Sequence, residues 1–458
     1  MRILYEVGIK FHHKDAIDVL KRNGVETDGD VAKFNETQIM KWIEKAPKVA
    51  PLYARNSKYD MQIGGDNVYP APCYGAASVT NADGTSRAAV MKDYTDFAKL
   101  FHTSPFHNIN GGVLVQPDDI PIKESPQILH YAAALLSDKC LIVSSGTEHA
   151  MESLMKMTGV MFDGAQALAE KPRILTIVNA NAPLQIDKTM LETLFTFAKH
   201  GQPFVMVQTC MAGTISPVTM AGTLAIGNAE VLAGIALSQM IRPGAPVIYA
   251  SQTAAADMRS GFMASGAPEG ALAYRNCTIM AKHYGLPCRG GGAVTDAPVV
   301  GAQSGYESMM NYLICSQSKM NLIIHSAGIL ESYAAVSFEK AICDFEIIGM
   351  VNKFLEGIDF SEDAIPFDLI KEAGHGGQYM TSDHTLEHFR ALFTPDISIR
   401  GKSQNAGQFD KNISGRLRQM LDSYKRPDFD ADKLRALEKL LLDEGVEQGL
   451  LDKIKSHI

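Results

Sequence analysis

The chain lacks any pair of cysteines at the C-x-x-C spacing that is typical of zinc sites and redox motifs. Its cysteines are odd in number, and most of them lie within apolar runs, where a cysteine packs as a small hydrophobic side chain. We therefore expect reduced, packed thiols rather than disulfides, structural zinc or catalytic cysteines. The seven are Cys73, Cys140, Cys210, Cys277, Cys288, Cys315 and Cys343.

An excess of positive charge is also missing. The 43 basic and 51 acidic side chains give a net charge of -8, which supplies no cationic field for a phosphate backbone and disfavours nucleic-acid binding. No apolar run approaches the roughly 20 residues that span a bilayer, and the first residues are typical of an amphipathic helix rather than a signal peptide. We expect a cytoplasmic protein that binds neither nucleic acid nor a membrane.

Short apolar runs at a regular spacing predict the fold. About 30 to 40 residues separate most runs from the next, which leaves room for one crossover helix in each gap. Near-continuous apolar strands are what a parallel sheet buried on both faces needs, and eight such units predict an α/β fold of the closed (β/α)8 barrel type. The runs are residues 72–79, 108–114, 140–145, 173–178, 203–209, 246–251, 286–291 and 321–325.

The flanking segments predict the domain organisation. Residues 1–60 carry an amphipathic stripe that prolines end, which indicates an N-terminal helical cap. Residues 61–345 hold the predicted barrel, and residues 346–458 predict a C-terminal helical extension that covers the barrel. Residues 81–84 are typical of a hairpin turn, which conflicts with a crossover after the first run.

The carboxyl ends of the predicted strands are where a barrel of this type builds its active site. These ends carry no pair of acids, which argues against glycosidase chemistry, and no lysine, which argues against a Schiff-base aldolase. One histidine among them gives only weak support to a metal-assisted hydrolase, so we expect no metal bound by this chain. The end residues are Tyr74, Asn110, Ser144, Asn179, Gln208, Gln252, Gly290 and His325.

Three consecutive glycines, Gly290, Gly291 and Gly292, close the seventh predicted strand. They are candidate cofactor-binding residues, because a backbone without side chains lets a ligand approach closely. They lack the G-x-G-x-x-G spacing before a helix, so close packing against a neighbouring part of the protein remains the alternative.

Several motifs along the chain closely resemble those of one known family, the trimethylamine methyltransferases. The resemblance covers nearly the whole chain. The matching segments are residues 3–8 (ILYEVG), 213–222 (GTISPVTMAG), 228–234 (NAEVLAG), 243–247 (PGAPV), 257–261 (DMRSG), 266–269 (GAPE), 284–287 (YGLP), 303–307 (QSGYE) and 384–386 (HTL).

The resemblance implies a barrel enzyme that passes a methyl group from an amine to the Co(I) corrinoid of a separate protein. Family members that use trimethylamine carry pyrrolysine, whereas this sequence contains only standard residues. A quaternary ammonium has no lone pair with which to add to pyrrolysine, so the resemblance implies a betaine demethylase. Glycine betaine, giving dimethylglycine and methyl-Co(III), is the favoured substrate, and proline betaine and carnitine remain open. No D-x-H-x-x-G corrinoid-binding pattern occurs, so we expect the corrinoid on a cognate partner protein.

Candidate substrate-binding residues follow from the chemistry of a betaine. A trimethylammonium group donates no N–H hydrogen bond, so aromatic faces must hold it. Candidates are Tyr74, Tyr249 and Tyr333, although for Tyr249 and Tyr333 a packed position at the barrel rim is the alternative. The resemblance favours Tyr74 and His325, and His325 is a candidate donor to the substrate carboxylate. Gln252, Gln208 and Arg259 are further candidates for that carboxylate.

No catalytic residue is assigned from the sequence, because methyl transfer from a quaternary amine releases a neutral amine without a general acid. Glu230, inside an apolar helical pattern, is expected to have a structural role. A non-catalytic betaine-binding module is the alternative of a different class. We expect a homo-oligomer, the default for a barrel enzyme of this size.

Overall fold

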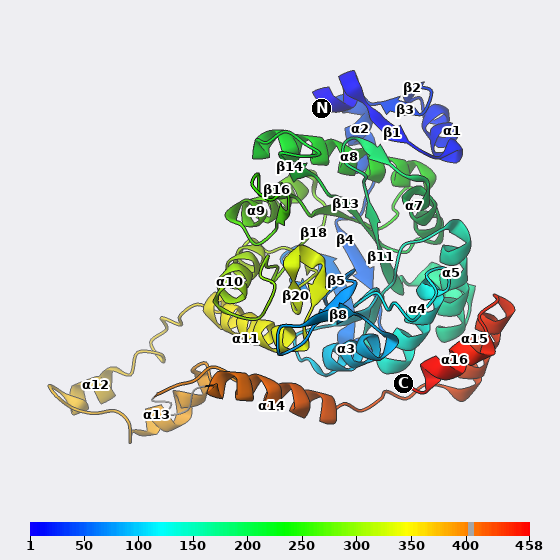
Figure 1. Cartoon of the computed structure of the whole chain (residues 1–458). Helices are drawn as coiled ribbons and strands as arrows, with labels where there is room; N and C mark the ends of the chain where they lie inside the picture. The colour runs from blue at the N-terminus through cyan, green and yellow to red at the C-terminus, as the bar shows by residue number, and fades with distance from the viewer. Residues whose placement is uncertain (402–406) are drawn as a thin grey trace.

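Eight parallel strands form a nearly closed barrel in the computed structural model, which describes residues 1–401 and 407–458 (Figure 1). Each strand pairs with the next in parallel from β9 to β19, and β19 then pairs with β6. The predicted (β/α)8 barrel is confirmed. The strands are β6 (Tyr69–Pro70), β9 (Ile109–Gly111), β10 (Cys140–Ile142), β11 (Ile174–Asn179), β13 (Phe204–Gln208), β15 (Val247–Ser251), β18 (Cys288–Gly290) and β19 (Leu322–Ile323).

The first predicted strand, residues 72–79, was misplaced. The barrel strand β6 ends before it, and β7 (Ser78–Thr80) instead pairs in antiparallel register with β8 (Ser86–Ala88). The turn expected at residues 81–84 joins these two strands, since the amide of Asn81 donates to the carbonyl of Thr85 at 2.8 Å. The turn residues at 81–84 therefore determine a hairpin here, although the spacing of the apolar runs predicted a crossover helix.

Eight helices surround the barrel and bury the outer faces of the strands. Alternation along each strand separates two hydrophobic clusters: in β13, Val205 and Val207 point into the barrel, whereas Phe204 and Met206 join the outer cluster with the helices. The helices are α3 (Met91–Thr103), α4 (Ser125–Leu136), α5 (Glu148–Met161), α7 (Lys188–His200), α8 (Met220–Ile241), α9 (Pro268–Tyr284), α10 (Ala302–Gln317) and α11 (Phe338–Leu355).

Helix α8 is, by length and composition, apolar enough to cross a membrane. This corrects the expectation that no apolar run approaches that length. In the fold, α8 lies against β13 and β15 on one side and against α1 (Lys14–Arg22) and α2 (Glu36–Ile43) on the other (Figure 1). Its apolar composition is explained by packing inside the protein.

The N-terminal cap contains strands as well as helices, which differs from the helical cap expected. Strand β1 (Ile9–Phe11) pairs with β3 (Val31–Lys33), β3 pairs with β2 (Glu26–Asp28), and β12 (Gln185–Ile186) joins the cap to the barrel. A hairpin of β4 (Val49–Leu52) and β5 (Met61–Gly64) follows. Its apolar side chains belong to the cluster inside the barrel, and Tyr53 bonds to Pro172 just before β11, so the hairpin closes the amino end of the barrel.

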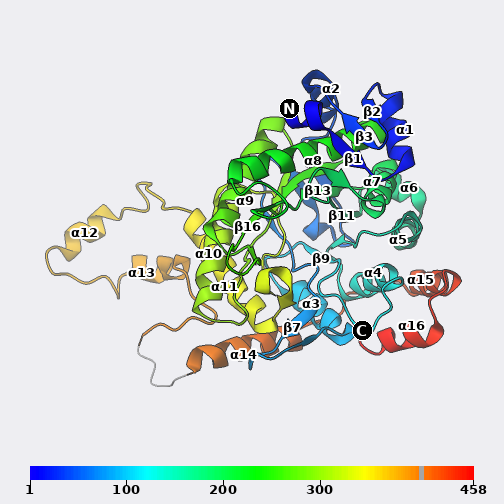
Figure 2. The same ribbon diagram turned by 45° about the horizontal axis from the view of Figure 1, so that its top comes forward.

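The C-terminal extension covers part of the outside of the barrel. Helix α14 (Gln408–Asp422) packs against α3 and α11, and α15 (Ala431–Asp443) packs against α5. Residues 356–392, which include α12 (Phe367–Ala373) and α13 (Asp383–His388), project sideways from the barrel (Figures 1 and 2). The last helix is α16 (Gln448–Lys455).

Short elements at the carboxyl ends of the strands form the barrel mouth. Strands β14 (Met211–Ala212), β16 (Ala254–Ala256) and β17 (Met263–Ala264) make one small sheet directly after β13 and β15. Strands β20 (Ile329–Leu330) and β21 (Ala335–Val336) make a hairpin that pairs with β7. The remaining short helix, α6 (Ala165–Glu170), follows α5.

Candidate active site

A fully buried arginine, Arg289, lies at the carboxyl end of β18 inside the barrel. One guanidinium nitrogen, Nη1, donates to Oε1 of Gln252 at 2.9 Å. Its Nε and Nη2 have no hydrogen-bond partner among the described residues. A buried cation that keeps two free donors is costly unless an anion reaches it, so this end of the barrel is suited to binding a carboxylate.

Sequence reasoning missed Arg289. The sequence prediction uses Gly290 as the end residue of the seventh strand, whereas alternation along β18 directs Arg289 inward and Gly290 outward. A basic residue inside an otherwise apolar strand was the signal that marks this position.

A histidine and two tyrosines lie beside this guanidinium. The rings of His325 and Tyr333 have centroids 4.8 Å apart, and the phenol oxygens of Tyr333 and Tyr274 are 2.8 Å apart. Burial, and then the charge of Arg289, lowers the pKa of His325 well below its ordinary value. The imidazole is therefore neutral, and its Nδ1 has no partner among the described residues.

Tyr74 brings a further aromatic ring to the same end of the barrel. Its ring packs against the cluster inside the barrel, and its hydroxyl donates to the carbonyl of Val143 at 3.4 Å. Burial raises the pKa of Tyr74, and Arg289 opposes that rise, which places the two side chains within electrostatic reach. Gly112 makes room for the ring, because a Cβ on Gly112 would lie 2.7 Å from it.

A strained turn positions Tyr333. Glu331, Ser332 and Tyr333 have φ values of 49°, 49° and 82°, a left-handed conformation that costs about 1 kcal/mol or more for each such residue. Asp296 holds the turn by accepting a hydrogen bond from the Ser332 hydroxyl. The same carboxylate accepts from the amide of Ser265 at 2.8 Å. The loops after β15, β18 and β20 are thereby joined around the Tyr333 ring.

The structure does not bring every predicted residue to this site. Tyr249 and Gln208 lie on the outward faces of β15 and β13, where Tyr249 donates to Asn228 at 2.8 Å and Gln208 packs on α8. The prediction ignored the alternation that separates the two faces of a strand. Arg259 is also absent from the cluster, because its side chain is 93% exposed beside Asp257 in a loop.

The three glycines do not face an open surface. Gly290, Gly291 and Gly292 are buried, and a Cβ on each would meet Met320, the Tyr274 ring or the backbone of Ser326. At these positions the glycines pack closely against other parts of the protein, which is the alternative to cofactor binding.

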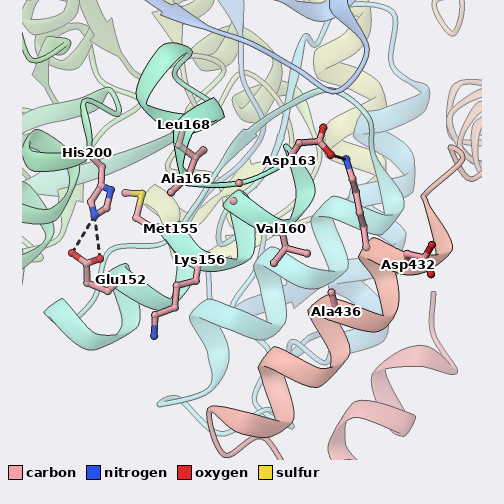
Figure 3. A pocket seen from close by; sticks show the side chains of 13 residues that line it. Glu152, Met155, Lys156, Val160, Asp163, Ala165, Leu168, His200, Asp432 and Ala436 are labelled. Carbon is pink, nitrogen blue, oxygen red and sulfur yellow. Dashed lines mark hydrogen bonds and ion pairs between the residues drawn. The ribbon is translucent and has the colours of Figure 1, made fainter.

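An open hollow of about 630 Å³ lies elsewhere, among helices α5, α6 and α15 (Figure 3). His200 and Glu152 pair across one side of it at 3.0 Å, and Lys433 pairs with Asp163 at 2.8 Å on another. None of its lining residues comes from a barrel strand. The candidate active site is therefore the cluster around Arg289.

Comparisons with known proteins agree along nearly the whole length of the chain. The family model described as trimethylamine methyltransferase matches residues 1–443. A glycine betaine methyltransferase of Desulfitobacterium hafniense is 36% identical, over 98% of this chain and 95% of that protein. A proline betaine:corrinoid methyltransferase of Eubacterium limosum is 29% identical, over 85% of this chain and 82% of that protein.

Among solved structures, the monomethylamine methyltransferase of Methanosarcina barkeri matches with a TM-score of 0.44 and 12% identity, over 93% of this chain and 97% of that one. The family model and the long matches to named methyltransferases lead to one conclusion. This chain belongs to the trimethylamine methyltransferase family.

Proposed function

We propose that this methyltransferase takes a methyl group from a quaternary amine that carries a carboxylate, with glycine betaine as its preferred substrate. The acceptor is the Co(I) corrinoid of a separate partner protein. The observation that carries the proposal is the guanidinium of Arg289, which is buried beside aromatic rings and has two donors without a partner in the described part of the chain. The 36% identity to a glycine betaine methyltransferase supports the choice of substrate.

The carboxylate binds to Arg289 in this proposal. Nε and Nη2 form one edge of the guanidinium, and a carboxylate accepts from two such donors in parallel. Gln252 fixes the opposite side of the group through Nη1. The neutral His325 supplies a further nitrogen, Nδ1, toward the ligand. A substrate without a carboxylate would leave the guanidinium uncompensated, which disfavours trimethylamine itself.

Aromatic rings hold the trimethylammonium group. Tyr74 and Tyr333 are the sequence-predicted rings that lie near Arg289, and each desolvated contact between a cation and a ring contributes about 2 kcal/mol. The carboxylate cancels the charge of the guanidinium, so the nearby substrate cation is not repelled. We propose that the ring of His325, whose centroid lies 4.8 Å from that of Tyr333 with the two planes inclined by 59°, limits where the methyl groups can lie.

In the transfer, the methyl carbon forms its new bond to the acceptor as the C–N bond breaks, and the electron pair stays on nitrogen. The product amine leaves neutral at nitrogen, so no residue of this chain has to move a proton. The task of the protein is positioning, which contributes about 7 to 11 kcal/mol in the best intramolecular cases.

The barrel mouth fits a docking partner that brings the acceptor. Its rim carries exposed apolar side chains on the loops around the small sheet, with Val218 67%, Met258 68% and Phe262 76% exposed. Apolar rims of this type are typical of protein interaction surfaces. We propose that the corrinoid protein docks here, because the methyl group must leave through the carboxyl end of the barrel.

An anaerobic assay tests the proposal. Purified chain, Co(I) cobalamin and one amine are mixed, and methylcobalamin is followed by its visible spectrum. The amines are glycine betaine, proline betaine, carnitine, trimethylamine and tetramethylammonium. We expect turnover with carboxylate-bearing quaternary amines, fastest with glycine betaine, and none with trimethylamine. Equal turnover of tetramethylammonium and glycine betaine contradicts the role given to Arg289.

A further inference from the structure

A projecting segment of the chain, residues 356–392, carries an unusual concentration of exposed apolar side chains. We call it the arm. It leaves the barrel at the end of α11 and projects beside α10 (Figures 1 and 2). None of its residues is buried. The large apolar side chains that it exposes are Ile358, Phe360, Ile365, Phe367, Ile370, Tyr379, Met380, Leu386, Phe389 and Leu392.

Both ends of the arm are attached to α11. Its first end continues α11, and beyond its second end the amides of Asp396 and Ser398 donate to the Glu346 carboxylate on α11. Phe360 is 78% and Met380 is 80% exposed. Soluble monomers rarely expose so many large apolar side chains together, and such surfaces mark an interface.

The charge of the arm indicates what covers it. The arm contains eight acidic and two basic side chains. Helix α12 combines both features, because it carries the exposed Phe367 and Ile370 together with Asp368 and Glu372, with Lys371 as its one basic residue. A short helix of this composition fits a groove that is apolar at its base and basic at its edge.

A groove of that composition lies on the same chain between α9 and α10, with a volume of about 510 Å³. Its lining includes Ile279 and Ile314 together with Arg275 and Lys282. No salt bridge joins Arg275 or Lys282 to another described residue. Along α9, Leu272, Arg275, Ile279 and Lys282 share one exposed face at helical spacing, so apolar and basic side chains alternate there.

We propose that the arm of one chain docks on the α9–α10 groove of a second copy of this chain, and that the exchange is reciprocal. Arm and groove lie on the same side of the barrel (Figure 1). A two-fold axis beside α11 therefore lets each arm reach the groove of the other chain, as an isologous interface requires. The exposed Met350 and Phe354 at the root of the arm face the axis and become covered as well.

The inference does not rest on the proposed function, and a measurement of mass tests it without any substrate. Light scattering and sedimentation of the full chain are expected to give a dimer or a larger even-numbered assembly. The variant Phe367→Ser/Ile370→Ser is expected to raise the dissociation constant at least about 100-fold. Ile122→Ser, at a side chain 74% exposed on a different surface, is the matched control and is expected to leave the mass unchanged. A monomeric wild type overturns the proposal.

A charge exchange tests the groove itself and guards against variants that fail to fold. Arg275→Glu/Lys282→Glu is expected to weaken assembly, and so is Asp368→Lys/Glu372→Lys. In a heterodimer of the two variants both contacts pair opposite charges again, because the native arm meets the native groove and the reversed arm meets the reversed groove. The mixture is therefore expected to assemble more tightly than either variant alone. An oligomer that neither reversal weakens overturns the proposed groove.

Cysteine crosslinking separates exchange between chains from folding back within one chain. An Ile279→Cys chain and a Phe367→Cys chain are mixed and oxidised. A covalent heterodimer of doubled mass is expected, with low background because six native cysteines are buried and Cys343 is partly buried. If only the double variant crosslinks, and it keeps the mass of a single chain, the arm covers its own groove and the proposal is overturned.

Discussion

The phenol oxygens of Tyr274 and Tyr333 lie 2.8 Å apart and join α9 to the strained turn after β20. The two residues are far apart in the sequence, yet their hydrogen bond fixes the Tyr333 ring, which contacts the ring of His325. Because the turn is left-handed at three residues, it depends on such contacts to keep its shape. The bond is therefore expected to matter for substrate binding more than for the stability of the barrel.

Tyr274→Phe removes this hydrogen bond while keeping the ring. We expect kcat/KM for glycine betaine to fall about 10-fold, the equivalent of about 1.4 kcal/mol, because Tyr333 loses its partner. Methylcobalamin formation measures the change. Tyr249→Phe is the control, since the Tyr249 hydroxyl bonds to Asn228 outside the barrel. Equal losses in the two variants contradict the placement of the site.

Two substitutions at Ser332 separate its hydrogen bonds from its backbone strain. Ser332→Ala and Ser332→Gly both remove the hydroxyl that donates to Asp296, so both are expected to lower kcat/KM. Only glycine relieves the left-handed backbone at φ 49°. We expect the glycine variant to be more stable than the alanine variant by about 1 kcal/mol in urea unfolding. A less stable glycine variant contradicts the strain at this turn.

Features that depend on neighbouring residues in the sequence could be predicted, whereas features that depend on contacts between distant residues could not. Seven of the eight barrel strands were predicted, because apolar runs and turn residues are local features. The register of each strand decides which side chains face inward. The predicted end of the seventh strand was one residue too far along, so Gly290 was selected and the inward-facing Arg289 was missed. Tyr74 and His325 were favoured by the resemblance to the family, and they lie in the segments that follow β6 and β19. The Tyr274–Tyr333 contact depends on tertiary packing, which no local pattern records.

Glu230 couples stability to pH. It is fully buried on α8, where its Oε1 accepts from the amide of Leu184 at 2.6 Å, and burial raises its pKa to about 7. A carboxyl group whose pKa is higher in the folded state than in the unfolded state contributes most to the free energy of unfolding at pH values below its unfolded pKa. Its contribution is lost as the pH rises toward 7.

Glu230→Gln keeps the acceptor and removes the charge. We expect the variant to gain stability relative to wild type as the pH is raised from about 5 to about 8, by up to about 3 kcal/mol. Urea unfolding at the two pH values measures this gain. For Glu26→Gln, at an exposed position on β2, the difference in free energy of unfolding from wild type is expected to stay the same at both pH values. Parallel pH profiles for wild type and Glu230→Gln contradict the charge-burial argument.

Arg289 is the residue on which substrate choice depends in the proposed function. Arg289→Lys keeps a positive charge but loses the two parallel donors, and Arg289→Gln loses the charge as well. We expect both to raise the dissociation constant for glycine betaine at least about 100-fold, measured by calorimetry without any corrinoid. Arg289→Gln should bind glycine betaine more weakly than Arg289→Lys does, because the glutamine leaves the substrate carboxylate without a counter-charge.

Arg259→Gln is the matched control for the carboxylate site, because Arg259 was predicted from the sequence and its side chain is 93% exposed outside the cluster. We expect it to change glycine betaine binding less than about twofold, which is about 0.4 kcal/mol. If Arg259→Gln weakens binding as much as Arg289→Gln, the carboxylate binds at the rim of the barrel. The buried guanidinium would then have a structural role, and the selection of carboxylate-bearing amines would need a different group.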